Sequence, residues 1–298
     1  MEATLINLND YVLAGGGAVG ESYNCPSNPT EMIKLYNEDY PMEQVIGELD
    51  LAQKVYSLGI PSPKPGELIT DGKRMGIRYF RILNKRSFAR AVSQEPERVK
   101  EFALEFAELA LTLHNTHCPA GLFPTFKEQH LSYLKDSKAF NDEEKAKIAA
   151  FLDTVPDSDC AVHGDFHFGN ALTDLGNGVP FSEPHKLYFI DLGTFCTGTP
   201  YQDLAMFYLV CHLNSEEMTQ DFYHMSNALA FEFWQVFAER YFFGEEKMGE
   251  KYFGEGATLP EIEKALMPFV GLRALFFENC TGLIIPQFTN YIREYILA

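Results

Sequence analysis

The sequence predicts an α+β protein of two lobes, and three observations lead to this fold class. Strand and turn signals fill residues 1–83, long helical patterns dominate residues 84–298, and two short strand-like runs interrupt the helical part. With 298 residues, 46% of them hydrophobic, the chain is long enough for two lobes with substantial cores. We expect a small antiparallel-sheet lobe with one helix, then a larger, mainly helical lobe that carries a β-hairpin.

The first lobe begins with short runs of β-forming residues separated by Gly, Pro and Asn, which indicate an antiparallel meander. A helix follows in "PMEQVIGELDLAQKVYSLGI", ended by Gly59 and the prolines of "PSPKP". Its expected apolar face consists of Val45, Leu49, Ala52, Val55 and Tyr56. The run "MGIRYFRIL" predicts a strand and "NKRS" a connector, so we place the lobe boundary between residues 83 and 84.

The second lobe opens with an amphipathic helix in "PERVKEFALEFAELALTLHNTH". Its apolar stripe consists of Val99, Phe102, Phe106, Leu109 and Leu113. Further helical patterns follow in "DLAMFYLVCHL", "ALAFEFWQVFAERYFF" and "LPEIEKALMPFVGLRALFF". Between the first helix and these, "NALTD" and "KLYFIDLG" flank the turn region Gly176-Asn177-Gly178, which predicts the β-hairpin.

Composition excludes some partners. The formal net charge of −18, from 42 acidic and 24 basic residues, would repel nucleic acid and anionic lipid, so we expect neither as a partner. The sequence has no signal-peptide pattern and no uncharged apolar run near the ~18 residues of a bilayer span, which predicts a cytoplasmic protein. Six cysteines without a Cys-x-x-Cys pair indicate free thiols instead of disulfides or a zinc knuckle.

The stretch "AVHGDFHFGN", residues 161–170, concentrates side chains that bind metals or protons. One interpretation makes His163, Asp165 and His167 direct ligands of a hydrolytic metal, because alternate residues of a strand or loop can face one point. The absence of a second cluster at ligand spacing weakens this metallohydrolase hypothesis.

The other interpretation combines Asp165 with Asn170 and with Asp191 beyond the hairpin. Phosphoryl transfer from ATP needs hard oxygen ligands for Mg²⁺, which Asn170 and Asp191 can supply. It also needs a carboxylate beside the acceptor hydroxyl, a role that suits Asp165 as general base. His163 would then orient the loop through backbone hydrogen bonds, and His167 would be structural or exposed to solvent.

This constellation resembles the aminoglycoside phosphotransferase and choline kinase family, whose small-molecule kinases share the protein-kinase fold. The family's catalytic-loop pattern stands here as "HGDFHFGN", its metal-binding strand end as "FIDLG", and a third motif as "GTPYQDLA" at residues 198–205. The resemblance implies an ATP- and Mg²⁺-dependent kinase that phosphorylates a hydroxyl of an amino-alcohol, amino-sugar, aminoglycoside or sugar. It also implies that Asp203, at the start of a helix, braces the catalytic loop as well as capping that helix.

For the first lobe, the resemblance implies a nucleotide loop, a strand lysine that touches phosphate, and a helix glutamate that holds the lysine. The stretch "GGGAVGESYN" supplies the loop, with Gly17, Gly20 and Ser22 as binding residues. Lys34 is the lysine, since a charge inside an apolar strand run is costly without an anionic partner. Glu48 is the expected glutamate, and Glu43 is the alternative.

Adenine would bind the connector around residues 79–83 through backbone groups, including those of Phe80 and Ile82. Relatives often carry Glu and then Gly in this connector, whereas this chain has Phe80 and Asn84, so GTP is possible in place of ATP.

The acidic composition favours a cationic acceptor. Candidate acceptor walls, or alternatively core residues, are Trp234, Phe276, Phe277, Glu278 and Tyr291. A non-catalytic nucleotide-binding protein on the same fold is the second functional class.

Overall fold

The structure is a computed structural model that describes residues 2–17, 19–176, 179 and 183–298. The chain forms two compact units. The first comprises Met1–Phe88 and Asn170–Gly193, and the second Ala89–Gly169 and Thr194–Ala298. These units are defined by packing alone, so the functional lobe boundary after residue 83 stays a prediction.

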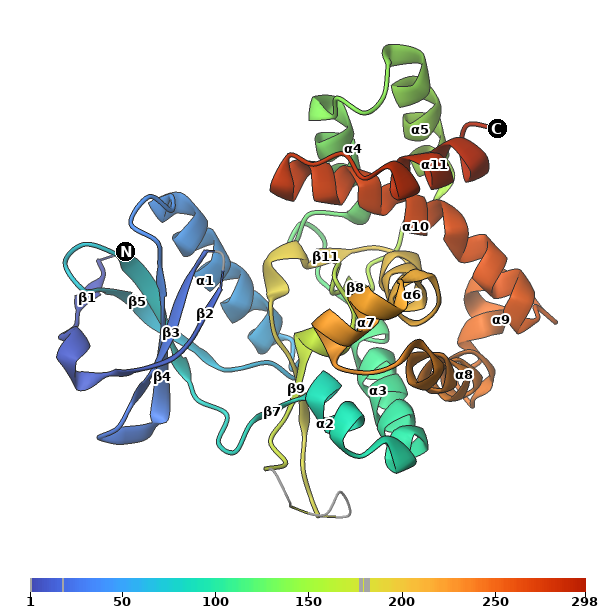
Figure 1. The fold of residues 1–298 in the computed structure, drawn as a ribbon. Helices are drawn as coiled ribbons and strands as arrows, with labels where there is room; N and C mark the ends of the chain where they lie inside the picture. Colours follow the sequence, from blue (N-terminus) through green and yellow to red (C-terminus); the bar gives the residue numbers. More distant parts are fainter. Residues whose placement is uncertain (1, 18, 177–178, 180–182) are drawn as a thin grey trace. The chain divides into compact units, whose positions relative to one another are not determined.

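A six-stranded sheet forms the centre of the first unit, with the strand order β1-β5-β6-β4-β3-β2 (Figure 1). Its strands are β1 (Thr4–Leu5), β2 (Val12–Gly17), β3 (Gly20–Cys25), β4 (Asn28–Tyr36), β5 (Pro65–Thr70) and β6 (Met75–Phe80). The pairings are antiparallel except that β1 runs parallel to β5. The predicted antiparallel sheet is therefore corrected at this edge. The long connection between β1 and β5 permits a parallel pairing that a short turn would not.

One helix, α1 (Met42–Ser57), packs on β5 and β6. Four of the five predicted apolar positions are buried, namely Val45, Leu49, Ala52 and Val55. Tyr56 is 42% exposed, contrary to the prediction. It follows Val55 directly, and successive helix residues point about 100° apart, so it leaves the buried face.

The predicted hairpin is present, but it packs with the first unit, whereas the sequence predicts it within the helical lobe. Strands β9 (Ala171–Thr173) and β10 (Leu187–Phe189) pair antiparallel, and β7 (Arg86–Ser87) adds a third strand beside β9. Of the predicted turn residues, Asn177 and Gly178 lie outside the described residues.

Helices make up most of the second unit. They are α3 (Val99–His114), α4 (Phe126–Asp136), α5 (Asp142–Thr154), α6 (Tyr201–Tyr208), α7 (Glu216–Tyr223), α8 (Asn227–Phe243), α9 (Met248–Phe253), α10 (Leu259–Thr281) and α11 (Pro286–Tyr295), preceded in the sequence by α2 (Phe88–Gln94). The predicted apolar stripe of α3 is buried throughout. Phe106 of that stripe lies within an aromatic core with Phe166, Phe207 and Phe237. A small antiparallel pair, β8 (Ala161–Val162) and β11 (Cys196–Thr197), lies beside these helices.

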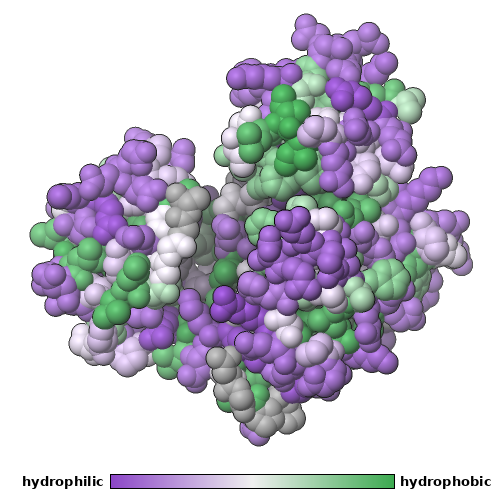
Figure 2. Space-filling model, viewed as in Figure 1, coloured by the Kyte–Doolittle hydropathy of each residue, from purple (hydrophilic) through white to green (hydrophobic). Residues whose placement is uncertain are grey.

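The exterior is mainly polar. Figure 2 shows hydrophilic residues over most of the visible face, with smaller apolar areas between them. Within the part of the chain that the structure describes, no helix is both long enough and apolar enough to cross a bilayer. The six cysteines are free, as expected, and only Cys280 is exposed.

Candidate active site

The loop after β8 is anchored by one buried carboxylate. Asp203 lies in the first turn of α6 and is fully buried. Its two oxygens accept hydrogen bonds from the backbone N–H groups of His163 and Gly164, both at 2.8 Å. A buried charge is tolerated when several donors satisfy it, so Asp203 fixes the backbone on which Asp165 stands.

A third partner of Asp203 comes from α3. The Nε2 atom of His114 lies 3.1 Å from an Asp203 oxygen, and its Nδ1 atom lies 2.7 Å from the hydroxyl of Tyr241. With the proton on Nε2, the imidazole donates to Asp203 and accepts from the Tyr241 phenol. All three side chains are fully buried. Sequence reasoning missed His114, because the end of an amphipathic helix gave no sign of a distant partner.

Gly164 meets a steric requirement of the loop. Its φ angle is +84°, and a Cβ atom there would lie only 2.3 Å from the Thr194 carbonyl oxygen. The Thr194 hydroxyl donates to the His163 carbonyl at 3.0 Å, which keeps the two segments in contact. Only glycine fits this position without displacing backbone.

Asp165 is paired with an arginine that sequence analysis did not identify. Arg273 of α10 is 2% exposed; it donates to an Asp165 oxygen at 2.6 Å and to the Gly164 carbonyl at 2.9 Å. Burial favours the neutral carboxyl, but the Arg273 charge and the nearby His167 outweigh it and hold the pKa of Asp165 well below its usual range. Asp165 is therefore ionised throughout the physiological pH range.

The arrangement does not support a metal held by His163, Asp165 and His167. The Nδ1 atom of His163 accepts the Asp165 N–H at 3.3 Å, and that of His167 accepts the Gly169 N–H at 3.0 Å. His167 is 14% exposed and directs Nε2 toward Asp165 at 3.5 Å, so it lies beside the carboxylate. Among the described residues, ligand atoms of three metal-binding side chains converge only at His117, Asp159 and Cys160.

In the first unit, Lys34 pairs with Glu48. Their Nζ and Oε1 atoms are 2.8 Å apart, and both side chains are 27% exposed. Lys34 lies on the central strand β4, opposite Ser22 of β3, and its Nζ atom lies 4.7 Å from the centre of the Tyr36 ring. The alternative partner, Glu43, is exposed. The pair has the predicted geometry, while its contact with a nucleotide stays a prediction.

The hairpin brings Asn170 and Asp191 close together within the same unit. The Ile190 N–H donates to the Asn170 carbonyl at 3.0 Å, which continues the β9–β10 ladder by one residue. Asp191 follows directly, with an exposed side chain and a φ angle of +58°. Burial, and then the charges of Glu48 and Asp191, raise the pKa of Tyr79. The carboxylates of Glu48 and Asp191 are therefore both near enough to the Tyr79 hydroxyl to raise its pKa.

The glycine-rich stretch forms the end of the β2–β3 hairpin. Gly17 pairs with Gly20 across its last rung. A Cβ atom on Gly20 would lie 2.3 Å from the Leu35 carbonyl oxygen. The close pairing of β3 with β4 therefore requires Gly20 whether or not a phosphate binds.

The predicted adenine connector begins where β6 ends at Phe80. The Phe80 N–H donates to the Lys64 carbonyl at 2.9 Å, so this amide is already used. Its ring is 52% exposed and lies 4.6 Å from the Lys64 ammonium group. Ile82, two residues beyond the strand, is partly exposed. Any backbone donor for a base would have to come from residues after Phe80.

Comparison with known proteins identifies the family. A family model described as "Phosphotransferase enzyme family" matches residues 29–249, and no curated protein matches the chain. The chain belongs to this phosphotransferase family, which makes it a small-molecule kinase, as predicted.

Solved structures with similar folds support the fold assignment. A candidate fructosamine-3-kinase from Haemophilus somnus 129PT has 14% identity and a TM-score of 0.57, covering 97% of this chain and 92% of its own. APH(2")-IIia in complex with GDP and kanamycin has 13% identity and a TM-score of 0.56, covering 97% and 91%. Amicoumacin kinase hAmiN, in complex with AMP-PNP, Ca²⁺ and Ami, has 12% identity and a TM-score of 0.52, covering 99% and 89%. The predicted α+β, protein-kinase-like fold is confirmed.

Proposed function

We propose that this chain is an ATP- and Mg²⁺-dependent kinase that transfers the γ-phosphoryl group to a hydroxyl of a small molecule. The observation that carries the proposal is the state of Asp165. Arg273 keeps this carboxylate ionised, and Asp203 fixes the loop from which it projects. An ionised, positioned carboxylate is what a hydroxyl acceptor needs during phosphoryl transfer.

Residues of the predicted lobe 1–83 would bind the phosphoryl donor. We assign phosphate contacts to Lys34, held by Glu48, and to the hairpin residues Gly17, Gly20 and Ser22. The Phe80 carbonyl and the backbone groups of Ile82 would accommodate the base, since the Phe80 amide already donates to the Lys64 carbonyl. ATP is our proposed donor and GTP the alternative, since one similar structure contains AMP-PNP and another GDP.

Asn170 and Asp191 fit a Mg²⁺ ion. They lie at adjoining positions of the β9–β10 hairpin, and they offer an amide oxygen and an exposed carboxylate, the hard ligands that Mg²⁺ prefers. The bound ion would neutralise charge on the phosphates. We expect Asp191→Ala to lose the thermal stabilisation that MgATP gives the native enzyme, measured by melting with and without nucleotide. An unchanged stabilisation would remove Asp191 from the metal site.

Asp165 would act mainly by orientation. A carboxylate whose pKa is held low is a weak base toward a free hydroxyl, so early proton abstraction is unfavourable. In a loose transition state the acceptor proton becomes acidic only as the new P–O bond forms. Asp165 would hold the hydroxyl in line and accept its proton late, while Arg273 keeps the carboxylate in place.

Aromatic side chains near Asp165 are the best candidates for an acceptor wall. The Tyr223 ring lies 5.4 Å from the ring of His167, which faces Asp165, and Phe276 lies 4.1 Å from the Arg273 guanidinium. Two other candidates have structural roles. Trp234 is fully buried, and Glu278 binds Ser137 and the Lys138 N–H.

We propose an amine-bearing alcohol or amino-sugar as the preferred acceptor. The net charge of −18 would attract a cation, and aromatic faces bind cations well. If electrostatic attraction speeds the encounter with a cationic acceptor, kcat/KM for that acceptor should fall clearly as ionic strength rises from ~0.01 to ~0.15 M. Over this range the screening length shrinks from ~30 to ~8 Å. A neutral preferred acceptor whose rate is indifferent to salt would contradict the cationic preference and leave the kinase assignment intact.

The experiment that tests the function is a coupled ADP-release screen across amino-alcohols, aminoglycosides, sugars and hydroxy amino acids. We expect acceptor-dependent ADP release together with a phosphorylated product detected by mass spectrometry. MgATP binding with no turnover on any acceptor would favour a non-catalytic nucleotide-binding protein.

A further inference from the structure

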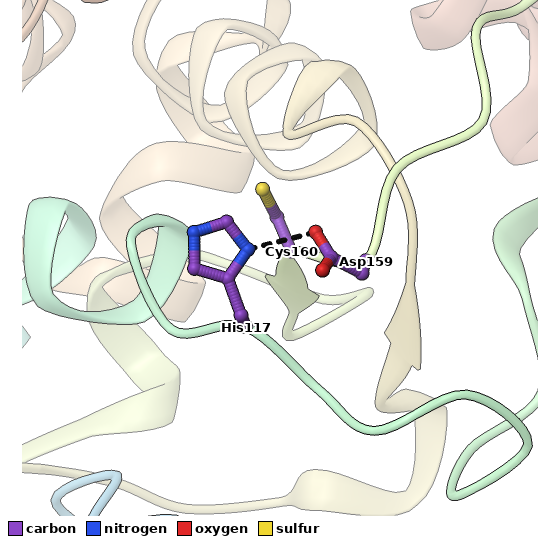
Figure 3. Close-up of side chains that lie close together, drawn as sticks. All are labelled: His117, Asp159 and Cys160. Atoms are coloured by element: carbon purple, nitrogen blue, oxygen red, sulfur yellow. Dashed lines mark hydrogen bonds and ion pairs between the residues drawn. The ribbon is translucent and has the colours of Figure 1, made fainter.

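Three metal-binding side chains meet in the second unit, outside the catalytic loop of residues 163–170. His117 follows α3, and Asp159 and Cys160 lead into β8, as Figure 3 shows. An antiparallel backbone bridge pairs His117 with Cys160, which sets the two segments side by side. A second backbone bond, from the Cys118 N–H to the Asp159 carbonyl at 2.8 Å, holds this register.

The distances suit a single ion. One ligand atom from each residue lies within 4.8 Å of the other two. The His117 Nδ1 and Asp159 Oδ1 atoms are 2.8 Å apart and share a hydrogen bond. With metal–ligand bonds near 2.0–2.1 Å, the N and O ligands of a tetrahedral zinc ion stand about 3.3 Å apart. Replacing the shared proton by zinc therefore requires only a small separation of these two side chains.

The chemistry of the three groups also favours zinc. Imidazole, carboxylate and thiolate are the three kinds of side chain that bind Zn²⁺. A carboxylate and a thiolate together carry two negative charges, which balance the two positive charges of Zn²⁺. The Lys251 ammonium group, which lines the same cavity, therefore faces a neutral centre and does not repel it. The Cys160 sulfur lies 3.5 Å from the Tyr252 hydroxyl, a partner that can orient it toward the ion.

A cavity gives access to the cluster. It has a volume of about 850 Å³, and His117, Asp159 and Cys160 all line it, together with Lys251 and Tyr252. Three protein ligands on an open cavity leave the fourth zinc position to water or an exchangeable ligand. A zinc ion can therefore reach the three side chains through the cavity without a change in the fold.

We propose that His117, Asp159 and Cys160 bind one Zn²⁺ ion at the wall of this cavity. The Cys160 thiol loses its proton to become the thiolate ligand, and the His117 proton moves from Nδ1 to Nε2, so binding releases one proton. The ion crosslinks the segment after α3 to Cys160, the residue directly before β8 and three positions before the loop begins at His163. Its three ligands are distinct from the residues that we assign to Mg²⁺ and to the phosphoryl donor.

The test measures zinc binding by the whole purified protein. After removal of metals with a chelator, we expect one Zn²⁺ per chain in a titration against a competing metal indicator. His117→Asn, Asp159→Asn and Cys160→Ser should each weaken binding by at least about 100-fold, more than the loss of an outer partner usually costs. Cys280→Ser, which removes the exposed thiol, is the matched control and should bind as the native chain does.

Co²⁺ provides a second readout. Thiolate coordination should give a near-ultraviolet charge-transfer band that Cys160→Ser abolishes. His117 and Asp159 are exposed, with side chains 67% and 62% accessible, so their variants will fold and decide the matter even if Cys160→Ser does not. The proposal is overturned if the native chain does not bind zinc stoichiometrically. It is also overturned if His117→Asn and Asp159→Asn bind zinc as tightly as the native chain does.

Discussion

The two units hold their key charged groups in different ways. In the second unit, fully buried Asp203 has three donors from two different segments. In the first, Lys34 has one carboxylate partner, and both side chains keep about a quarter of their surface exposed. A buried and fully paired group fixes its surroundings before any substrate arrives, whereas a half-exposed ion pair leaves donors available for a phosphate. The catalytic loop is thus preorganised, and the lysine is kept accessible.

The largest effect should come from the residue that the preorganised loop presents. Asp165→Asn should lower kcat by at least about 100-fold, because the amide can neither accept the hydroxyl proton nor pair as strongly with Arg273. Affinity for MgATP, measured by calorimetry, should stay within a few-fold of the native value. Turnover close to that of the native enzyme would show that the loop is not catalytic.

Asp203→Ala tests the anchor itself. Removing the carboxylate leaves the His163 and Gly164 N–H groups without this acceptor, and each unsatisfied buried group costs about 1–3 kcal/mol. We expect the free energy of unfolding to fall by about 3 kcal/mol, measured with urea. The control is Asp142→Ala in the first turn of α5, where an exposed aspartate should contribute below about 1 kcal/mol. Equal losses in the two variants would mean that Asp203 is an ordinary helix-terminal charge.

Arg273→Gln tests how Asp165 stays ionised. Because the folded-state pKa of Asp165 is depressed, the pair stabilises the protein above the unfolded pKa of about 3.9, and this contribution is lost as pH falls through the folded value. Without Arg273, burial raises the pKa of Asp165, so the acid limb of kcat should move to higher pH. Arg273→Lys keeps the charge and should keep the native profile. A pH–rate profile of Arg273→Gln that matches the native enzyme would limit Arg273 to packing.

Lys34→Ala should have the smallest effect on stability. A half-exposed ion pair contributes about 1 kcal/mol or less, so the melting temperature should barely change. The KM for ATP should rise about tenfold if Lys34 binds phosphate. Lys54→Ala, which breaks the exposed pair with Asp50 on α1, is the control and should change neither quantity. An unaltered KM in Lys34→Ala would exclude the nucleotide contact.

Local patterns were sufficient for much of the fold and for part of the site. Apolar periodicity located α1 and the buried stripe of α3, and the hairpin followed from two short strand-like runs. Lys34 was identified because a charge inside an apolar strand must have a partner. The same reasoning applies to Arg273 within "PFVGLRALFF", where it would have pointed to an anion such as Asp165.

Other features depend on contacts between residues far apart in the chain. The pairing of β1 with β5, the bond from His114 to Asp203 and the meeting of His117 with Cys160 join segments that carry no mutual signal in one sequence. The prediction for Tyr56 is wrong because an apolar residue next to a buried one can still be exposed, since successive helix residues point about 100° apart. Such features follow from tertiary packing, which overrides local preference.

The discontinuity of the first unit has a consequence for synthesis on the ribosome. Strand β7 ends at Ser87, but its partner β9 begins only at Ala171, after a long stretch of the second unit has been made. At about 5–20 residues per second, the nascent chain spends several seconds with the edge of β7 unpaired. Arg86 of β7, which is buried in the folded protein, also lacks its neighbouring strand until β9 has been made. The six-stranded sheet can therefore form early, whereas the separate sheet of β7, β9 and β10, whose hairpin is flanked by Asn170 and Asp191, forms late, after the first helices of the second unit have emerged.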